Sequence, residues 1–135
     1  MRQRNSSFCF QRNALTAAVL SALASIAQAL PQGGTVAAGA GSLSASGDNL
    51  TVNQGSQKLI IDWQGFGIAA GESVQFVQPN SSAVALNRVL GNNSSEIYGS
   101  LSANGQVFLT NPNGILFGPT AQVDVGGLVA STLNI

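Results

Sequence analysis

The sequence of 135 residues has no histidine, one cysteine and few charged side chains, which make up 7% of it. Histidine and cysteine at characteristic spacings form most zinc sites, and acidic side chains at fixed intervals form calcium loops. Neither pattern occurs in this sequence. Scattered carboxylates are the remaining candidates for acid–base catalysis. The sequence therefore predicts no metal site and no cofactor.

The N-terminal segment 1–29 differs in composition from the rest of the chain. Three arginines precede an uninterrupted apolar stretch at 14–27, and a small-residue triplet follows it. A basic start, a short apolar middle and a small-residue end are typical of a secretory signal peptide, and this apolar stretch is short for a bilayer span. We predict a signal peptide at 1–29 that is cleaved between Ala29 and Leu30. An uncleaved signal anchor is the alternative.

Cleavage would change the charge balance of the chain. It would remove three of the five basic residues together with the only cysteine, Cys9. The mature chain keeps two basic residues, Lys58 and Arg88, against five acidic ones, which gives a formal net charge of −3. A protein that tracks phosphates needs a basic stripe, so we predict no nucleic-acid partner. A secreted domain without a disulfide must be held by its backbone ladder and its core.

Residues 30–135 show no convincing helical period, and glycines interrupt them every few residues. In 58–63, Leu59, Ile61 and Trp63 alternate with residues of the opposite face, as in a half-buried strand. The same alternation recurs at 74–76, 107–109 and 123–125, and clusters of Asn, Gly, Pro and Ser separate these short segments. The pattern predicts an all-β fold.

An internal repeat favours a β-solenoid over a sandwich or a barrel. The stretch 41–55, GSLSASGDNLTVNQG, aligns with the stretch 99–114, GSLSANGQVFLTNPNG. The offset between the two copies fits two or three coils of about 20 to 25 residues each. In stacked coils, the side-chain amides of asparagines at the turns are expected to form hydrogen-bonded ladders from one coil to the next.

The segment TNPNGILFG at 110–118 combines a turn with two apolar stretches. Its centre satisfies the four positions of a type I turn with Asn111, Pro112, Asn113 and Gly114. We expect this turn to direct Ile115 and Phe117 into the core.

From Leu30 onward the chain resembles the secretion domain of two-partner secretion exoproteins, the filamentous-haemagglutinin N-terminal domain family of Gram-negative bacteria. The matching stretches follow the family order and lie at 30–44, 50–76, 78–118 and 121–132. The resemblance implies a right-handed parallel β-helix at 30–135 with N-terminal capping strands. It also implies that an outer-membrane two-partner transporter recognises the domain in the periplasm through its polypeptide-transport-associated domains.

The family has two motif regions. Its Asn-Pro-Asn-Gly-Ile motif is intact at 111–115, where the resemblance implies a role in transporter recognition or in folding. Its Asn-Pro-Asn-Leu motif is missing, and the stretch 78–91 in that region resembles the high-molecular-weight-adhesin branch. The secondary candidate residues are Gln78, Pro79, Asn80, Asn87 and Arg88. Strands at 58–63, 74–77 and 106–110 could add to the sheets of the transport-associated domains while the exoprotein is incompletely folded.

These features predict a non-enzymatic address domain at the N-terminal end of a longer exoprotein. Such an exoprotein is secreted through the periplasm to the cell surface or the medium, where its remainder could meet host-cell ligands. Two alternatives stay open at this point. One is a self-contained surface adhesin or carbohydrate-binding module, and the other is a fragment of a β-helical polysaccharide-degrading enzyme.

Overall fold

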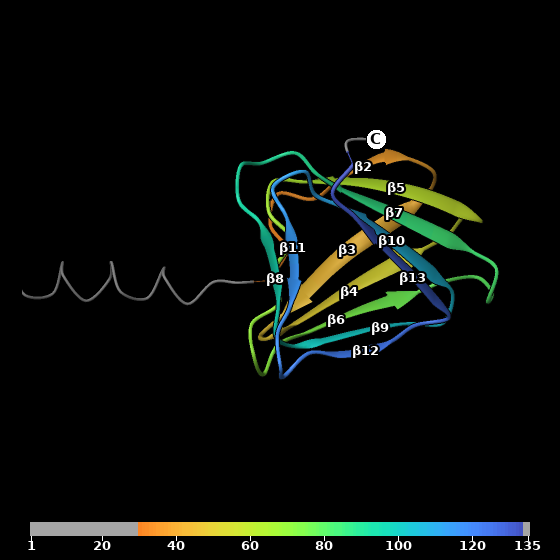
Figure 1. The fold of residues 1–135 in the computed structure, drawn as a ribbon. Coiled ribbons are helices and arrows are strands. Elements are labelled where there is room, and N and C mark those ends of the chain that lie inside the picture. Colours follow the sequence, from red (N-terminus) through yellow and green to blue (C-terminus); the bar gives the residue numbers. More distant parts are fainter. Residues whose placement is uncertain (1–29, 134–135) are drawn as a thin grey trace, which may run out of the picture.

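A computed structural model describes residues 30–133, which form twelve strands, named β2 to β13 (Figure 1). This part of the chain contains no helix, and hence none long and apolar enough to cross a membrane. The predicted signal peptide lies outside the described residues, so the boundary between Ala29 and Leu30 stays a prediction.

The chain winds through three sheets in a fixed order, and successive coils pair in parallel. The first sheet contains β4 (Asn49–Gln54), β6 (Ser73–Val77), β9 (Ser100–Ala103) and β12 (Gln122–Asp124). The second sheet contains β5 (Lys58–Trp63), β7 (Val84–Val89), β10 (Gln106–Thr110) and β13 (Gly127–Ser131). The third sheet contains β8 (Ser95–Ile97) and β11 (Ile115–Phe117), with an isolated bridge from Ile68 to Ile97.

The register between neighbouring strands shows that the coils differ in length. In the first sheet, Asn49 pairs with Ser73, Ser73 with Ser100 and Ser100 with Gln122, so the middle step is the longest and the last is the shortest. In the second sheet, the paired positions 58, 84, 106 and 127 move closer together toward the C-terminal end. The predicted parallel β-solenoid is therefore confirmed, with coils of unequal length.

Two antiparallel strands close the N-terminal end of the solenoid, which confirms the predicted capping strands. β3 (Gly41–Ser46) forms a hairpin with β4, and β2 (Thr35–Ala38) pairs with β5. In Figure 1 they lie beside β4 and β5, at the opposite end of each sheet from β12 and β13.

The offset between 41–55 and 99–114 was expected to span two or three whole coils, and this was wrong, because the aligned strands β4 and β10 lie in different sheets. The first copy folds back on itself as the β3–β4 hairpin, whereas the second copy passes from β9 in the first sheet to β10 in the second. The difference lies at the turns. Gly47 has a positive φ of 58°, which suits a two-residue hairpin turn, while the aligned Gly105 does not have a positive φ.

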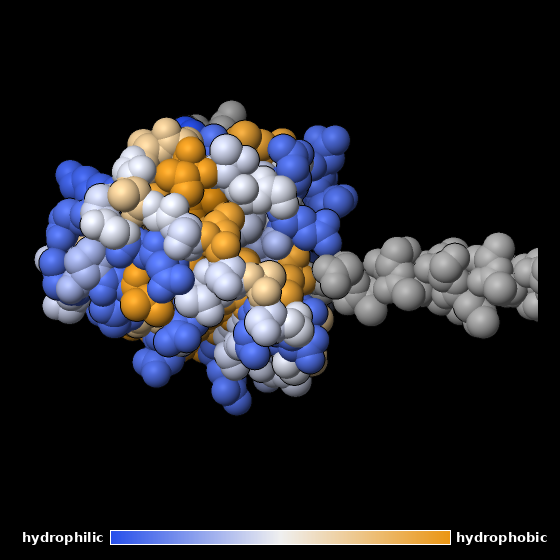
Figure 2. Space-filling view, turned by 180° about the vertical axis from the view of Figure 1, so that it is seen from behind, coloured by the Kyte–Doolittle hydropathy of each residue, from blue (hydrophilic) through white to orange (hydrophobic). Residues whose placement is uncertain are grey.

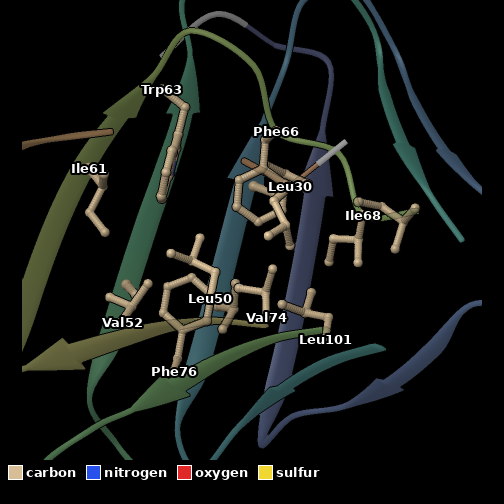
Figure 3. Close-up of a cluster of buried hydrophobic side chains, with 14 of the residues drawn as sticks. Leu30, Leu50, Val52, Ile61, Trp63, Phe66, Ile68, Val74, Phe76 and Leu101 are labelled. Atoms are coloured by element: carbon tan, nitrogen blue, oxygen red, sulfur yellow. The ribbon is translucent and has the colours of Figure 1, made fainter. Parts of the chain in front are cut away.

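The core is a column of apolar side chains enclosed by the three sheets (Figure 3). The alternation expected in β5 is confirmed, because Leu59, Ile61 and Trp63 are all buried. Val74 and Phe76 of β6 and Val107 and Leu109 of β10 are buried in the same way. On the outside, polar side chains surround a run of apolar ones on the face that Figure 2 shows.

A matched pair of substitutions tests this core. Leu109→Ala removes a fully buried side chain and should lower the free energy of unfolding by about 2 to 5 kcal/mol. Leu116→Ala, at a side chain that is 50% exposed, should change it by less than about 0.5 kcal/mol. Urea unfolding of both variants can be followed by the fluorescence of Trp63, the only tryptophan and a buried one. An equal decrease in the free energy of unfolding of the two variants would contradict the described packing.

Candidate recognition site

The Asn-Pro-Asn-Gly segment forms the predicted turn at the corner between β10 and β11. The N–H of Gly114 donates to the C=O of Asn111 at 3.0 Å, which closes the four-residue turn. The Oδ1 atom of Asn111 accepts the backbone N–H of Asn113 at 2.9 Å. The side chain at the first turn position thus acts as an acceptor, as the sequence predicts.

Asn111 also ties this turn to the neighbouring coils. Its side chain is fully buried, and Nδ2 donates to the C=O of Asn93 at 3.0 Å and to Oγ of Ser95 at 2.9 Å. Its backbone N–H donates to the C=O of Ser131 at 3.0 Å in the following strand β13. The turn residue therefore contacts the coil before it and the coil after it. This is the geometry of a residue that fixes the register of stacking.

The remaining motif residues divide between surface and interior. Pro112 and Asn113 are exposed, although Nδ2 of Asn113 donates to the C=O of Gly91 at 2.8 Å. Ile115 is half-buried and packs against the core, as expected. The expectation for Phe117 was wrong, because its side chain is 37% exposed. β11 has a strand partner on one side only, so Phe117 has no neighbouring coil above it among the described residues.

Gln78, the first of the secondary candidates, lies inside the corner between β6 and β7. Its Nε2 donates to Oε1 of Gln54 at 3.2 Å and to the C=O of Gln106 at 3.2 Å, and its Oε1 accepts the N–H of Gly105 at 2.8 Å. Gln54 is buried beside it. The expected ladder of side-chain amides between coils is confirmed at this corner. Gln54 and Gln78 form its buried part, and Asn80 donates through Nδ2 to Oε1 of Gln57 at 2.9 Å at the surface.

Asn87 and Arg88 make contacts between β7 and its neighbours. The Oδ1 atom of buried Asn87 accepts the indole N–H of Trp63 at 2.9 Å, and its Nδ2 donates to the C=O of Phe108 at 3.2 Å. The half-buried Arg88 donates to both carboxylate oxygens of Asp62, at 2.7 and 3.0 Å. These two candidates therefore hold adjacent coils together.

Pro79 and Asn80 are the secondary candidates that lie at the surface. Asn80 Oδ1 accepts the N–H of Ser82 at 3.1 Å, within the turn that leads into β7. This turn lies between the first and second sheets, whereas 111–114 lie between the second and third sheets. The fold thus places the turn of Pro79 and Asn80 at a different corner from 111–114. The other end of the stretch 78–91 adjoins the motif, because Arg88 is paired with Thr110 and Nδ2 of Asn113 donates to the C=O of Gly91.

Sequence reasoning missed Gln54 as the partner of Gln78. A signal was present, because each glutamine follows an apolar strand residue by two positions, Val52 and Phe76 respectively. Those two apolar residues are directly paired between β4 and β6, so the glutamines that follow them are stacked at the same corner.

Parallel coils with an antiparallel cap at the N-terminal end define a capped β-solenoid. The family model of the TPS secretion domain, the secretion domain of two-partner secretion exoproteins, matches residues 27–135. The chain belongs to this family, and its role is that of a secretion-address domain of a large exoprotein.

Similar proteins come from Haemophilus influenzae. A protein named heme/hemopexin-binding protein from strain Rd is 42% identical over 109 residues, which are 81% of this chain and 12% of that protein. A second protein of the same name is 49% identical over 88 residues, which are 65% of this chain and 10% of that protein. The crystal structure of the HMW1 secretion domain matches with a TM-score of 0.75 at 40% identity, over 78% of this chain and 28% of that chain.

Substitutions within the motif should separate its buried residue from its exposed one. Asn111→Ala removes the Nδ2 group that donates to the C=O of Asn93 and to Oγ of Ser95. The substitution should lower the free energy of unfolding by roughly 2 to 3 kcal/mol. Asn113→Ala, at an exposed side chain, should cost about 1 kcal/mol or less. Urea unfolding measures both values. The structural account of Asn111 fails if the two variants are equally stable.

A second pair tests the contacts of β7. Asn87→Ala leaves the indole N–H of Trp63 without its buried acceptor and should cost about 1 to 3 kcal/mol. Arg88→Ala breaks a partly exposed ion pair and should cost at most about 1 kcal/mol. The emission maximum of Trp63 in the folded state should shift in the Asn87→Ala variant and stay unchanged in the Arg88→Ala variant. A shift in the Arg88 variant instead would contradict the assigned contacts.

Proposed function

We propose that an outer-membrane two-partner transporter recognises residues 30–135 in the periplasm through its polypeptide-transport-associated domains. The domain then crosses the transporter unfolded and folds at the cell surface, where it starts the β-helix of the exoprotein. The observation that carries this proposal is the capped solenoid of a chain that belongs to a secretion-domain family. The chain is 40% identical in sequence to the HMW1 secretion domain over the matched part.

The cap supports a direction of folding. β2 and β3 cover β5 and β4 at the N-terminal end of the sheets, so further coils stack only on the side of β12 and β13. Each added coil buries apolar side chains and contributes about 25 cal/mol per Å² of apolar surface removed from water. Folding outside the cell would therefore oppose return through the transporter without any nucleotide.

The exposed part of the Asn-Pro-Asn-Gly motif is the first candidate for direct contact with the transporter. Pro112 and Asn113 lie on the surface, whereas Asn111 lies in the interior. In this proposal, Asn111 shapes the turn and the two exposed residues are read by the partner. Pro79 and Asn80 form a second exposed turn at another corner.

We further propose that the domain is not catalytic. Two of its carboxylates already serve the fold, because Asp62 pairs with Arg88 and Glu72 Oε1 accepts the N–H of Ala69 at 2.9 Å. Glycosidases need two carboxyl groups facing one substrate bond. The other three, Asp48, Glu96 and Asp124, lie on the hairpin turn, on β8 and on β12, respectively.

Contacts with host molecules are assigned in this proposal to other parts of the exoprotein. The matched segment makes up 12% and 10% of the two relatives that are named for binding heme or hemopexin. An adhesive or ligand-binding role of the whole exoprotein would then depend on segments beyond the address domain.

Secretion of the chain with a C-terminal tag tests the proposal. We expect export into the medium only when the cognate transporter is present. Asn113→Ala should reduce export at least about tenfold, a loss of roughly 1.4 kcal/mol of recognition, while urea unfolding of the refolded chain stays close to wild type. Asn53→Ala, at an exposed side chain of β4 outside both motif regions, serves as the matched control and should be exported like wild type. Export that does not depend on the transporter would refute the proposed function.

A further inference from the structure

The three strands predicted to add to a partner's sheet have no free edge in the folded domain. β5 lies between β2 and β7, β6 between β4 and β9, and β10 between β7 and β13. Their backbone groups are therefore shared with neighbours on both sides. A partner could pair with these strands only before the solenoid forms.

β3 is different, because it ends the first sheet and has β4 as its single strand partner among residues 30–133. Its register with β4 is unbroken from Gly41 opposite Gln54 to Ser46 opposite Asn49. In an antiparallel pair, alternate residues exchange hydrogen bonds with the partner strand, and the residues between them point their N–H and C=O groups away.

The hydrogen bonds beyond the strand show which residues of β3 point away. Gly55 N–H donates to the C=O of Ala40 at 2.8 Å, so Ala40 belongs to the set bonded to the β4 side. Because the pattern alternates along the strand, the backbone groups of Ser42, Ser44 and Ser46 are also bonded to β4. The N–H and C=O groups of Gly41, Leu43 and Ala45 therefore face the open edge.

This edge also lacks the usual protection against pairing. Natural edge strands are often blunted by charges, proline, a bulge or short length. β2, the other capping strand, has four residues and an irregular register between Val36 and Ala38. β3 has six residues, GSLSAS, with no charge, no proline and no register shift.

We propose that the free edge of β3 accepts an extended strand from the periplasmic domains of the transporter. This inference rests on the proposed function and deepens it by naming the surface that is read. The backbone N–H and C=O groups of Gly41, Leu43 and Ala45 supply the hydrogen bonds. The small exposed side chains of Ser42 and Ser44 let the partner strand approach closely.

The hairpin is suited to recognition before the solenoid is complete. Its two strands are joined by a two-residue turn at 47–48, so it forms from local contacts, in about 1 to 10 μs for a typical hairpin. An isolated two-stranded hairpin is marginally stable in water, and a third strand stabilises it. The partner's strand would supply this third strand at the edge opposite to β6, which pairs with β4 in the finished domain.

Proline substitutions at neighbouring positions test the edge. Ala45→Pro removes an N–H that faces the open edge, and we expect transporter-dependent export to fall at least about tenfold, while urea unfolding of the refolded chain stays close to wild type. Ser44→Pro removes an N–H bonded to β4 and should lose both export and stability. Wild-type chain without the transporter is run in parallel.

Cysteine crosslinking gives a second readout that does not alter the backbone. The mature chain has no cysteine, so Ser44→Cys introduces its only thiol on the exposed face of β3. During export, this thiol should crosslink to single cysteines placed on strands of the transporter's periplasmic domains. Thr120→Cys, in the exposed turn before β12 and outside both motif regions, is the control and should not crosslink.

The outcomes separate this inference from the proposed function. If wild type needs the transporter for export and the folded Ala45→Pro variant is exported equally well, the inference about the β3 edge is wrong and the proposed function stands. A Ser44→Cys adduct with a second copy of the chain, or an adduct no stronger than that of Thr120→Cys, would also overturn the inference about the β3 edge. Export of wild type without a transporter would overturn the proposed function itself.

Discussion

The ladder of backbone hydrogen bonds between stacked coils is the interaction on which the rest of this structure depends. Parallel coils can slide past one another, and these coils differ in length, as the uneven spacing of the paired positions 49, 73, 100 and 122 shows. The register must therefore be set at the corners. Buried side-chain amides do this, with Gln78 bonded to Gln54 at one corner and Asn111 bonded to Ser95 at another.

Most of the fold could be predicted from residue patterns. Alternation in β5 identified the buried face of Leu59, Ile61 and Trp63, and turn chemistry identified the turn at 111–114. The repeat between 41–55 and 99–114 led to the right architecture for the wrong reason. Similar residues at 41–46 and 99–104 enter different turns, because the positive φ of Gly47 reverses the chain and Gly105 has no positive φ.

The candidate site was less predictable, because polarity in a sequence does not distinguish a buried amide from an exposed one. Gln78 and Asn87 were proposed as candidates for recognition, and both are buried and bonded between coils. Phe117 was expected in the core and is partly exposed, since no further coil covers β11 in the described part of the chain. Such outcomes depend on which residues become stacked, and that requires the coil lengths.

The same ladder connects fold and function. It pairs the backbone of the inner strands on both sides, and within the described part of the chain it leaves β3 with an unpaired, uncharged edge at the capped end. Residue-resolved amide hydrogen exchange, with and without the transporter's periplasmic domains, tests most directly whether this edge is read. The account predicts new protection at the N–H groups of Gly41, Leu43 and Ala45. Protection confined to 111–115, or none, would contradict it.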